Sequence, residues 1–546
     1  MNRSGSKIVL QSLKDLGVDT LFGYPGGAVI PLYDALYDET DHFNHIRTAH
    51  EQSAIHGADA YSRATGKVGV CIVTSGPGAT NAITGIANAY LDSVPLLVLS
   101  GQVPCALLGK DSFQEVDVTG ITMGITKKNY LVRDIDDLEK TVKEALSVAT
   151  TGRKGPVLID IPKDVFLAKT EYKNLEVNLD IDNLVCDNCN KTIDLLKNAE
   201  RPVIIAGGGI KSAGASKLLV DLAEKLHIPV LNTLMGLGTI DRNHDLSYGL
   251  VGMHGSKEAN LAVKNCDLLL AIGMRFSDRV IGNPKFFAPD SKIVHFEIDS
   301  TELDKNLDTY LHVTGDLKVN LEHIYNNVDK QYDTSWADKV STFKSSRQKL
   351  EEFNAKLIID SLNKQYEDAF IVTDVGQHQI WTAQHWSFKR DDSFITSGGL
   401  GTMGFGIGAA IGTQVGNPND TVILFTGDGS FRMCAQELLT ISKYNLPVKI
   451  ILFNNHSLGM VRQWQDLFQD KKFSETTLYD HVDYIKLCDA FGIKAYKTEN
   501  NNELQEVLEA NKDFNGPILI ECVIDNNQFA YPIIPPGQSV DHIMEG

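Results

Sequence analysis

The sequence has few of the features that place a chain in a membrane or in an oxidising compartment. It has only eight cysteines and four tryptophans among 546 residues, and no apolar run approaches the length of a membrane span. The amino terminus, Met1 to Leu13, has amphipathic helical spacing and lacks the apolar stretch of a signal peptide. Most cysteines stand in apolar runs, which is typical of reduced core residues. We therefore expect a cytoplasmic protein without membrane contact.

Two further absences narrow the range of functions. Basic residues are outnumbered, since 51 lysines and arginines stand against 70 acidic residues and leave a formal charge of −19. This balance argues against binding to nucleic acid or to anionic membranes. The CxxC segment from Cys186 to Cys189 has neither a second cysteine pair nor a nearby histidine, so a zinc or redox role is not favoured.

Alternating apolar runs and helical patterns divide the chain into three α/β units. A length of 546 residues suggests three domains of ordinary size. Strands that alternate with helices form parallel sheets, so we predict three doubly wound parallel-sheet domains. Polar or charged connectors place these domains at residues 1–173, 190–335 and 355–546. The strand-like runs are residues 20–22, 68–73, 95–99, 156–160, 202–206, 267–271, 293–298 and 369–373.

The most informative motif is Gly427-Asp428-Gly429-Ser430, which ends a strand-like run at 421–425. Helical spacing follows at 433–441, and a second run at 448–453 delivers Asn454-Asn455. Ligands bind at the carboxyl ends of parallel strands. An Asp and an Asn there offer oxygens suited to Mg²⁺, and the glycines allow phosphate oxygens to approach the backbone. The pattern predicts a site for a metal ion and a diphosphate.

A second motif centres on Glu51, which follows a short extended segment and precedes a helix-like run at 54–64. An acidic residue in a first helical turn interacts favourably with the helix dipole, and this is the simpler interpretation. A carboxyl group in an apolar cleft would instead have a raised pKa and could share a proton at neutral pH. The residues alone leave both interpretations open.

Gly427-Asp428-Gly429 and the later Asn454-Asn455 together resemble the thiamin diphosphate fingerprint, in which GDG is followed by NN. Nearly the whole chain is similar to acetohydroxyacid synthase, the catalytic acetolactate synthase of branched-chain amino acid synthesis. This resemblance implies a pyrimidine-binding, a central and a diphosphate-binding domain. It also implies a transferase that decarboxylates pyruvate and joins the two-carbon unit to pyruvate or 2-ketobutyrate. The similar segments are residues 23–31, 101–104, 112–117, 152–156, 252–255, 275–279, 374–379, 397–405 and 458–464.

The resemblance assigns catalytic and cofactor roles residue by residue. It implies that Glu51 bonds N1′ of the cofactor's aminopyrimidine and that the Gly27 backbone lies beside the reacting carbonyl. The Mg²⁺ ligands would be Asp428, Asn455 and the Ser457 carbonyl, whereas His456 is a loop residue. The implied thiamin diphosphate residues are Glu51, Val375, Gln377, His378, Met403, Gly427, Asp428, Gly429, Ser430 and Asn455, with Met403 wedged under the cofactor.

The family pattern also implies how the second substrate is chosen. Arg279 would bind the carboxylate of the second substrate, because the forked N–H groups of a guanidinium match the geometry of a carboxylate. Trp464 would favour an ethyl over a methyl group, a contact worth roughly 1–3 kcal/mol. A surface ion pair for Arg279 and a core position for Trp464 are the simpler alternatives. Phe113, Gln114, Met460 and Val461, with Lys127 or Lys128, would complete the cleft.

The central unit raises the question of a flavin. Its loop Gly207-Gly208-Gly209 opens like a dinucleotide loop, but Ser212 stands where GxGxxG needs its last glycine, so a Rossmann fingerprint is not met. The resemblance nevertheless implies a non-redox FAD. Ser277 departs from the family's RFDDR motif, which weakens this prediction. The implied FAD residues are Arg153, Gly207, Gly208, Gly209, Thr233, Leu234, Met253, His254, Arg275, Glu297, Ile298 and Asp316.

Three alternatives compete with the biosynthetic enzyme. These are an FAD-free catabolic acetolactate synthase, a pyruvate oxidase, and an inactive homologue that binds the cofactor for regulation. Intact Glu51, Asp428 and Asn455 argue against the last. In this family the domain that carries Glu51 faces the Asp428 domain of another subunit, which implies a homodimer or homotetramer. The resemblance also implies a small regulatory subunit.

Overall fold

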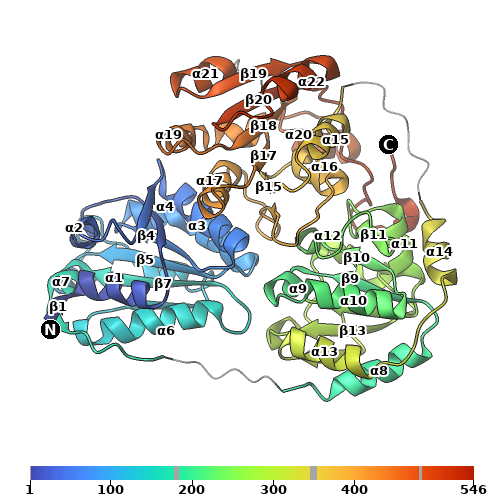
Figure 1. The fold of residues 1–546 in the computed structure, drawn as a ribbon, viewed down its shortest axis with the longest axis horizontal. Helices are drawn as coiled ribbons and strands as arrows, with labels where there is room; N and C mark the ends of the chain where they lie inside the picture. The colour runs from blue at the N-terminus through green and yellow to red at the C-terminus, as the bar shows by residue number, and fades with distance from the viewer. Residues whose placement is uncertain (1, 178–183, 345–352, 479–481) are drawn as a thin grey trace.

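The structure is a computed structural model that describes residues 2–177, 184–344, 353–478 and 482–546 (Figure 1). It contains three six-stranded sheets, and β1 (Asn2–Ser4) and β8 (Lys169–Glu171) form a separate antiparallel pair. Every neighbouring pair within the three large sheets is parallel. Helices flank each sheet, as Figure 1 shows. The predicted α/β fold with three parallel-sheet domains is confirmed.

The first and last sheets share one connectivity. Their orders are β3-β2-β4-β5-β7-β6 and β16-β15-β17-β18-β20-β19. In chain order, each therefore reads second, first, third, fourth, sixth, fifth. The strands of the first are β2 Thr20–Gly23, β3 Asn44–Arg47, β4 Gly69–Val73, β5 Leu96–Gln102, β6 Lys128–Leu131 and β7 Pro156–Pro162. Those of the last are β15 Phe370–Thr373, β16 Phe394–Ile395, β17 Val422–Gly427, β18 Lys449–Asn454, β19 Lys494–Thr498 and β20 Ile518–Val523.

The central sheet is connected differently, in the order β11-β10-β9-β12-β13-β14. In chain order this reads third, second, first, fourth, fifth, sixth, which is the strand order of dinucleotide-binding sheets. The strand order reverses between β9 and β12, and sheets of this kind bind their ligand at that position. The strands are β9 Pro202–Ala206, β10 Val230–Asn232, β11 Ser247–Leu250, β12 Leu268–Ile272, β13 Lys292–Glu297 and β14 Leu311–Thr314.

The helices are short, and among the described residues none is both long and apolar enough to cross a membrane. In the first domain they are α1 Gly5–Asp15, α2 Ile30–Tyr37, α3 Glu51–Thr65, α4 Pro77–Leu91, α5 Val118–Thr122, α6 Leu138–Thr150 and α7 Lys163–Leu167. In the central domain they are α8 Asn188–Asn198, α9 Gly208–Ser212, α10 Ser216–Leu226, α11 Lys257–Asn265, α12 Asp278–Ile281, α13 Leu317–Asn327 and α14 Ser335–Ser341.

The last domain has α15 Ala355–Gln365, α16 Gln377–His385, α17 Gly406–Gly416, α18 Asp428–Arg432, α19 Leu438–Lys443, α20 Gly459–Phe468, α21 Tyr484–Ala490 and α22 Asn501–Ala510. The expectation of one helix over residues 433–441 was wrong. The chain turns at Cys434, whose φ is −139°, and continues as a short 3-10 helix from Ala435 to Glu437 before α19. Apolar periodicity does not reveal such a break.

The first and last domains pack on each other through α3 and α17, which lie side by side in Figure 1. Both helices follow the second strand of their sheets. Glycines make the contact close, since a Cβ on Gly412 would lie 1.9 Å from the Gly57 carbonyl oxygen. Ile55 and Ile411 belong to one buried apolar cluster. This packing fixes the start of α3, where Glu51 lies, relative to the loop that precedes α17.

Candidate functional site

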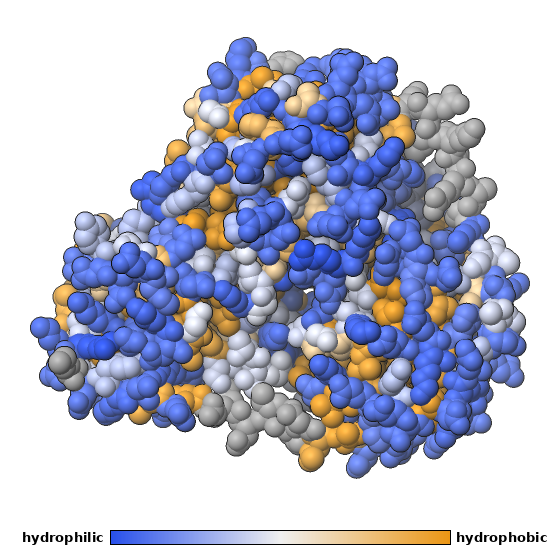
Figure 2. Space-filling view, in the orientation of Figure 1, coloured by the Kyte–Doolittle hydropathy of each residue, from blue (hydrophilic) through white to orange (hydrophobic). Residues whose placement is uncertain are grey.

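A cavity of about 1250 Å³ opens where the three domains meet. Figure 2 shows a largely hydrophilic face that is hollowed between the domains. Its lining includes Arg153 from the first domain, Glu297 from the central domain and Met403 from the last. Pockets for small ligands usually hold 300–1,000 Å³. This cavity therefore has room for a large ligand or for parts of two.

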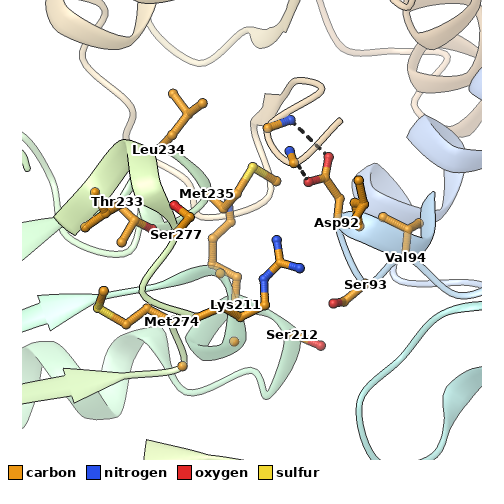
Figure 3. A pocket seen from close by; sticks show the side chains of 18 of the residues that line it. Asp92, Ser93, Val94, Lys211, Ser212, Thr233, Leu234, Met235, Met274 and Ser277 are labelled. Carbon is orange, nitrogen blue, oxygen red and sulfur yellow. Dashed lines mark hydrogen bonds between the residues drawn. The ribbon is translucent and has the colours of Figure 1, made fainter. Parts of the chain in front are cut away.

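The central-domain side of the cavity lies at the reversal of the strand order. Gly207 donates a backbone hydrogen bond to Ile272 (2.9 Å), and Gly209 donates one to Gly273 (2.9 Å). A Cβ on Gly207 would lie 2.1 Å from the Gly273 carbonyl oxygen, so the loops after β9 and β12 approach as closely as glycine allows. All the predicted FAD residues except Gly207 line the cavity. Figure 3 shows Thr233, Leu234 and Ser277 on this side.

Charged residues on this side are already oriented by partners. The Arg153 guanidinium pairs with Asp299 (3.0 Å) and Glu302 (2.9 Å) and donates through Nε to Ser93 Oγ (2.9 Å). Burial raises the pKa of the Glu297 carboxyl. Asp316 caps α13 by accepting from the Val319 amide. A ligand would therefore meet a preformed polar wall.

The residues predicted to choose the second substrate also meet in the cavity, where Arg279 lies next to the predicted FAD residue Met253. Arg279 lies at the start of α12, and its guanidinium carbon is 5.8 Å from the ring centre of Trp464 on α20. Trp464 is half-buried at the cavity edge, so the alternative of a core aromatic is wrong. Arg279 pairs loosely with Asp278 (3.8 Å), and both side chains are exposed. The lining here also includes Val375, Met403, Met460 and Val461.

The predicted metal residues also come together. Asp428 and Asn455 follow adjacent parallel strands, β17 and β18, in which Gly427 is paired with Phe453. Asp428 is 1% exposed, and burial raises its pKa to about 7. Its Oδ1 accepts from the Gly429 amide (3.1 Å), whereas Oδ2 has no hydrogen-bond partner among the described residues. A buried carboxylate oxygen without a partner is costly, so this donor set fits a hard cation.

The neighbouring polar residues lie against this pair. Asn455 donates to Gln377 Oε1 (3.3 Å) and accepts from the Ser457 amide (3.1 Å). His378 is buried, which lowers its pKa to about 3, so its ring is neutral. Its Nδ1 lies 3.0 Å from the place that a Cβ on Gly427 would take. Any side chain at position 427 would therefore collide with this ring.

Glu51 lies elsewhere, at the start of α3. Its Oε2 accepts from Asn81 Nδ2 of α4 (3.0 Å), and its Oε1 is 3.4 Å from the place of a Cβ on Gly78. Thr74 lies against the same glycine and accepts from the Ala28 amide, next to Gly27. We call this group of Gly27, Glu51 and Thr74 the N-terminal half-site.

The half-site is separate from the cavity of its own chain. The described cavity lining lacks Gly27, Glu51, Phe113 and Gln114. It also lacks other predicted residues, namely Lys127, Lys128, Gln377, His378, Gly427, Asp428, Gly429, Ser430, Asn455 and Ser457. Phe113 is 88% exposed, and Gln114 packs against Gly76, beside the half-site. Glu51 therefore lies outside the cavity that Met403 lines.

Comparison with known proteins supplies the family. Residues 3–121 match "Thiamine pyrophosphate enzyme, N-terminal TPP binding domain", residues 189–324 match the central domain of these enzymes, and residues 374–522 match their C-terminal TPP binding domain. Thiamine pyrophosphate is another name for thiamin diphosphate. Relatives extend over the whole chain. The "Acetolactate synthase large subunit" of Lactococcus lactis is 43% identical over 99% of this chain and 96% of its own.

Two further relatives agree. The "Acetolactate synthase isozyme 2 large subunit" of Escherichia coli is 42% identical over 99% of both chains. The "Probable acetolactate synthase large subunit" of Methanocaldococcus jannaschii is 42% identical over 99% of this chain and 95% of its own. The chain belongs to the acetolactate synthase large subunits. The predicted family is confirmed.

Some residues that line or support the site of this acetolactate synthase family member were not identified from the sequence. Asp374 follows β15 and accepts from the amides of Gly404 (2.9 Å) and Gly406 (3.0 Å). Its position directly after a strand-like run was a usable signal. Arg63 and Asp92 line the cavity as well. The spacing of Asp59 and Arg63, one helical turn apart, predicts an ion pair. Nothing in the sequence around Asp92 indicates that it joins this pair.

Proposed function

We propose that this chain is the catalytic subunit of a biosynthetic acetolactate synthase. It decarboxylates pyruvate and transfers the two-carbon unit to pyruvate or 2-ketobutyrate, in the synthesis of valine, leucine and isoleucine. The observation that carries this proposal is the meeting of Asp428 and Asn455 at adjacent strand ends, with one carboxylate oxygen unpartnered. Membership of the family supports the substrates, since the relatives are named acetolactate synthases.

In this proposal Asp428, Asn455 and the Ser457 carbonyl would hold Mg²⁺, a cation that prefers oxygen ligands and phosphate groups. Gly427 and Gly429 leave space at the backbone for phosphate oxygens. Thiamin diphosphate, when bound, supplies the carbon nucleophile and the electron sink that loss of CO₂ from a 2-keto acid requires. Met403 would pack beneath it. The other residues proposed to contact it are Val375, Gln377, His378 and Ser430.

The Glu51 carboxyl group would hydrogen-bond N1′ of the aminopyrimidine, and the Gly27 backbone would lie beside the reacting carbonyl. Both belong to the N-terminal half-site, which does not line the described cavity. A second copy of the chain would bring its half-site to the cavity. The smallest active species is therefore a homodimer, and a tetramer is a pair of these.

The second substrate binds between Arg279 and Trp464. The guanidinium holds its carboxylate, and the indole contacts its alkyl group, so 2-ketobutyrate is preferred to pyruvate. Met460, Val461 and Val375 give the cavity apolar walls. Phe113 and Gln114 of the second copy complete the cleft. Dry walls also favour loss of CO₂, because they remove water from the carboxylate.

FAD occupies the central-domain side of the cavity and takes no part in electron transfer. Two observations support this assignment: the strand order of a dinucleotide-binding sheet and the cavity lining by the predicted residues. Ser277 takes the place before α12 and also lines the cavity. A small regulatory subunit is a further partner, since the relatives are named large subunits.

The test is a competition assay in which the purified chain receives pyruvate and 2-ketobutyrate together, with Mg²⁺ and thiamin diphosphate, with and without FAD. We expect both acetohydroxy acids, with the 2-ketobutyrate product in excess, and a yellow protein. Product without flavin binding would favour the catabolic enzyme. Oxygen consumption with acetyl phosphate formation would favour pyruvate oxidase, and no product would favour the inactive homologue.

A further inference from the structure

The loop of residues 397–405, here called the Met403 loop, joins β16 to α17 and lies between the two sides of the cavity. Ser397, Gly398, Gly399, Leu400, Gly401 and Met403 all line the cavity. Met403 is the residue proposed to pack under thiamin diphosphate, whereas the beginning of the loop faces the proposed FAD side. The contacts that hold this loop therefore determine where Met403 and the beginning of the loop lie in the cavity.

The beginning of the loop is held from the first domain. Asp92, at the end of α4, accepts the amide of Gly398 through Oδ2 (3.1 Å) and that of Gly399 through Oδ1 (2.7 Å). Figure 3 draws Asp92 with both hydrogen bonds. The Asp92 side chain has no exposed surface. Hydrogen bonds to an ionised acceptor are about twice as strong as neutral ones, so this is a firm attachment.

Asp92 is itself fixed by Arg63. The Arg63 guanidinium donates to Asp92 Oδ2 (2.9 Å) and to Asp59 Oδ1 (2.6 Å), and it also donates to the Thr396 carbonyl (2.9 Å), immediately before the loop. Its carbon lies 5.8 Å from the ring centre of Phe405, the last residue of the loop. One arginine thus contacts both ends of the Met403 loop and the aspartate that holds it.

The far end of the loop is held from within the last domain, by the bonds from Gly404 and Gly406 to Asp374. Between the two ends, the Thr402 amide donates to Ser397 Oγ (2.8 Å), and Ser397 Oγ donates to Asn88 Oδ1 (2.5 Å). The loop is therefore a short bridge between two buried carboxylates that belong to different domains.

The attachment continues to the proposed FAD side. Ser93 follows Asp92 in the chain and accepts from Arg153 Nε (2.9 Å), and Arg153 is bound to Asp299 and Glu302 of the central domain. A continuous set of contacts thus runs from the central domain through Arg153, Ser93 and Asp92 to Gly398 and Gly399. A ligand that shifts Arg153 would therefore also shift the beginning of the Met403 loop.

We propose that Asp92 is a positioning residue that couples occupancy of the FAD side of the cavity to the placement of Met403 under thiamin diphosphate. This inference rests on the proposed function, because it requires that the chain bind both cofactors. It gives a non-redox flavin a definite task. Binding of FAD holds the loop in the conformation that thiamin diphosphate needs.

The test measures the dissociation constant of thiamin diphosphate by equilibrium dialysis with Mg²⁺, with and without saturating FAD. In the unaltered chain we expect FAD to tighten binding about tenfold, within the usual range of couplings between sites. In Asp92→Asn, one of the two loop amides would face an amide N–H₂ instead of an oxygen acceptor. The ratio of the dissociation constants of thiamin diphosphate without and with FAD should then fall below about twofold. The same factor should appear in FAD affinity, measured by flavin fluorescence with and without thiamin diphosphate.

Two variants complete the design. Asp391→Asn is the control, because Asp391 lines the same cavity but accepts from Ser216 of α10 (2.6 Å), and it should keep the tenfold ratio. Ser93→Ala removes only the bond from Arg153 and should lower the ratio even if Asp92→Asn does not fold. A ratio of one in the unaltered chain, or an unchanged ratio in the folded variants, overturns the coupling alone. Failure of the unaltered chain to bind FAD would instead remove the FAD assignment, and the coupling with it.

Discussion

The unpartnered oxygen of Asp428 makes the metal-free chain sensitive to pH. Burial raises the pKa of this carboxyl from 3.8 to about 7. Because the folded state binds its proton more tightly than the unfolded state, stability falls as pH rises from about 4 to about 7. Above pH 7 the buried charge costs about 4 kcal/mol, at 1.36 kcal/mol for each pH unit that separates the two pKa values.

Asp428→Asn removes this charge and keeps the shape of the side chain. The new amide still has a buried group without a partner, which costs about 1–3 kcal/mol. The net gain for the metal-free chain at pH 7.5 is therefore about 1–3 kcal/mol, and a domain of this size gains roughly 2–4 °C of melting temperature per kcal/mol. At pH 4 the carboxyl of the unaltered chain is protonated, so the gain should disappear and the variant should be less stable by the cost of its amide, about 1–3 kcal/mol.

Thermal unfolding in EDTA measures this effect, at several pH values. In the unaltered chain, Mg²⁺ with thiamin diphosphate at about 100 times its Kd should add about 2.7 kcal/mol; in Asp428→Asn it should add almost nothing. Asp513→Asn is the matched control, because Asp513 is exposed in the same domain, and it should change neither curve. A metal-free Asp428→Asn chain that melts below the unaltered one at pH 7.5 would refute the reasoning.

Three other outcomes are expected. Glu51→Gln should lose most of its turnover while dialysis still shows bound thiamin diphosphate, because the amide keeps the size of the side chain but not its acid–base group; full turnover would sink the assigned role. Trp464→Leu should lower the preference for 2-ketobutyrate by about 10–200-fold in the competition assay, as loss of apolar contact implies, and an unchanged product ratio would contradict it. Gly412→Ala places a Cβ 1.9 Å from the Gly57 carbonyl oxygen. This should force α3 away from α17 and lower the melting temperature, whereas Gly124→Ala, where the place of the Cβ is open and φ is not left-handed, should lower it less.

Much of the fold could be predicted because parallel strands buried on both faces are continuous apolar runs. The runs that end before Asp374, Asp428 and Asn454 predicted the strands and also indicated where the proposed cation site lies, since polar residues at strand ends share one edge of a sheet. The strand order of the central sheet could not be predicted. With Ser212 in place of the last glycine, the local motif was absent, although the arrangement that such motifs accompany was present.

The rest depended on contacts between distant parts of the chain. The two bonds from Gly398 and Gly399 to Asp92 join residues that are 306 and 307 positions apart, and no periodicity reports such pairs. The separation of Glu51 from the cavity was likewise invisible in local sequence. It was expected only from the family's subunit arrangement. The exact domain boundaries at 173, 190, 335 and 355 stay predictions.

The contact between α3 and α17 has an implication for the history of the chain. Each of these helices follows the second strand of its sheet, and the two sheets have the same strand order. Equivalent surfaces that pack on each other are characteristic of the twofold interface of a homodimer. Here the interface lies within one polypeptide, with the central domain between the two halves in sequence. Duplication of a single-sheet ancestor, followed by divergence of one copy toward Glu51 and the other toward Asp428, produces this arrangement.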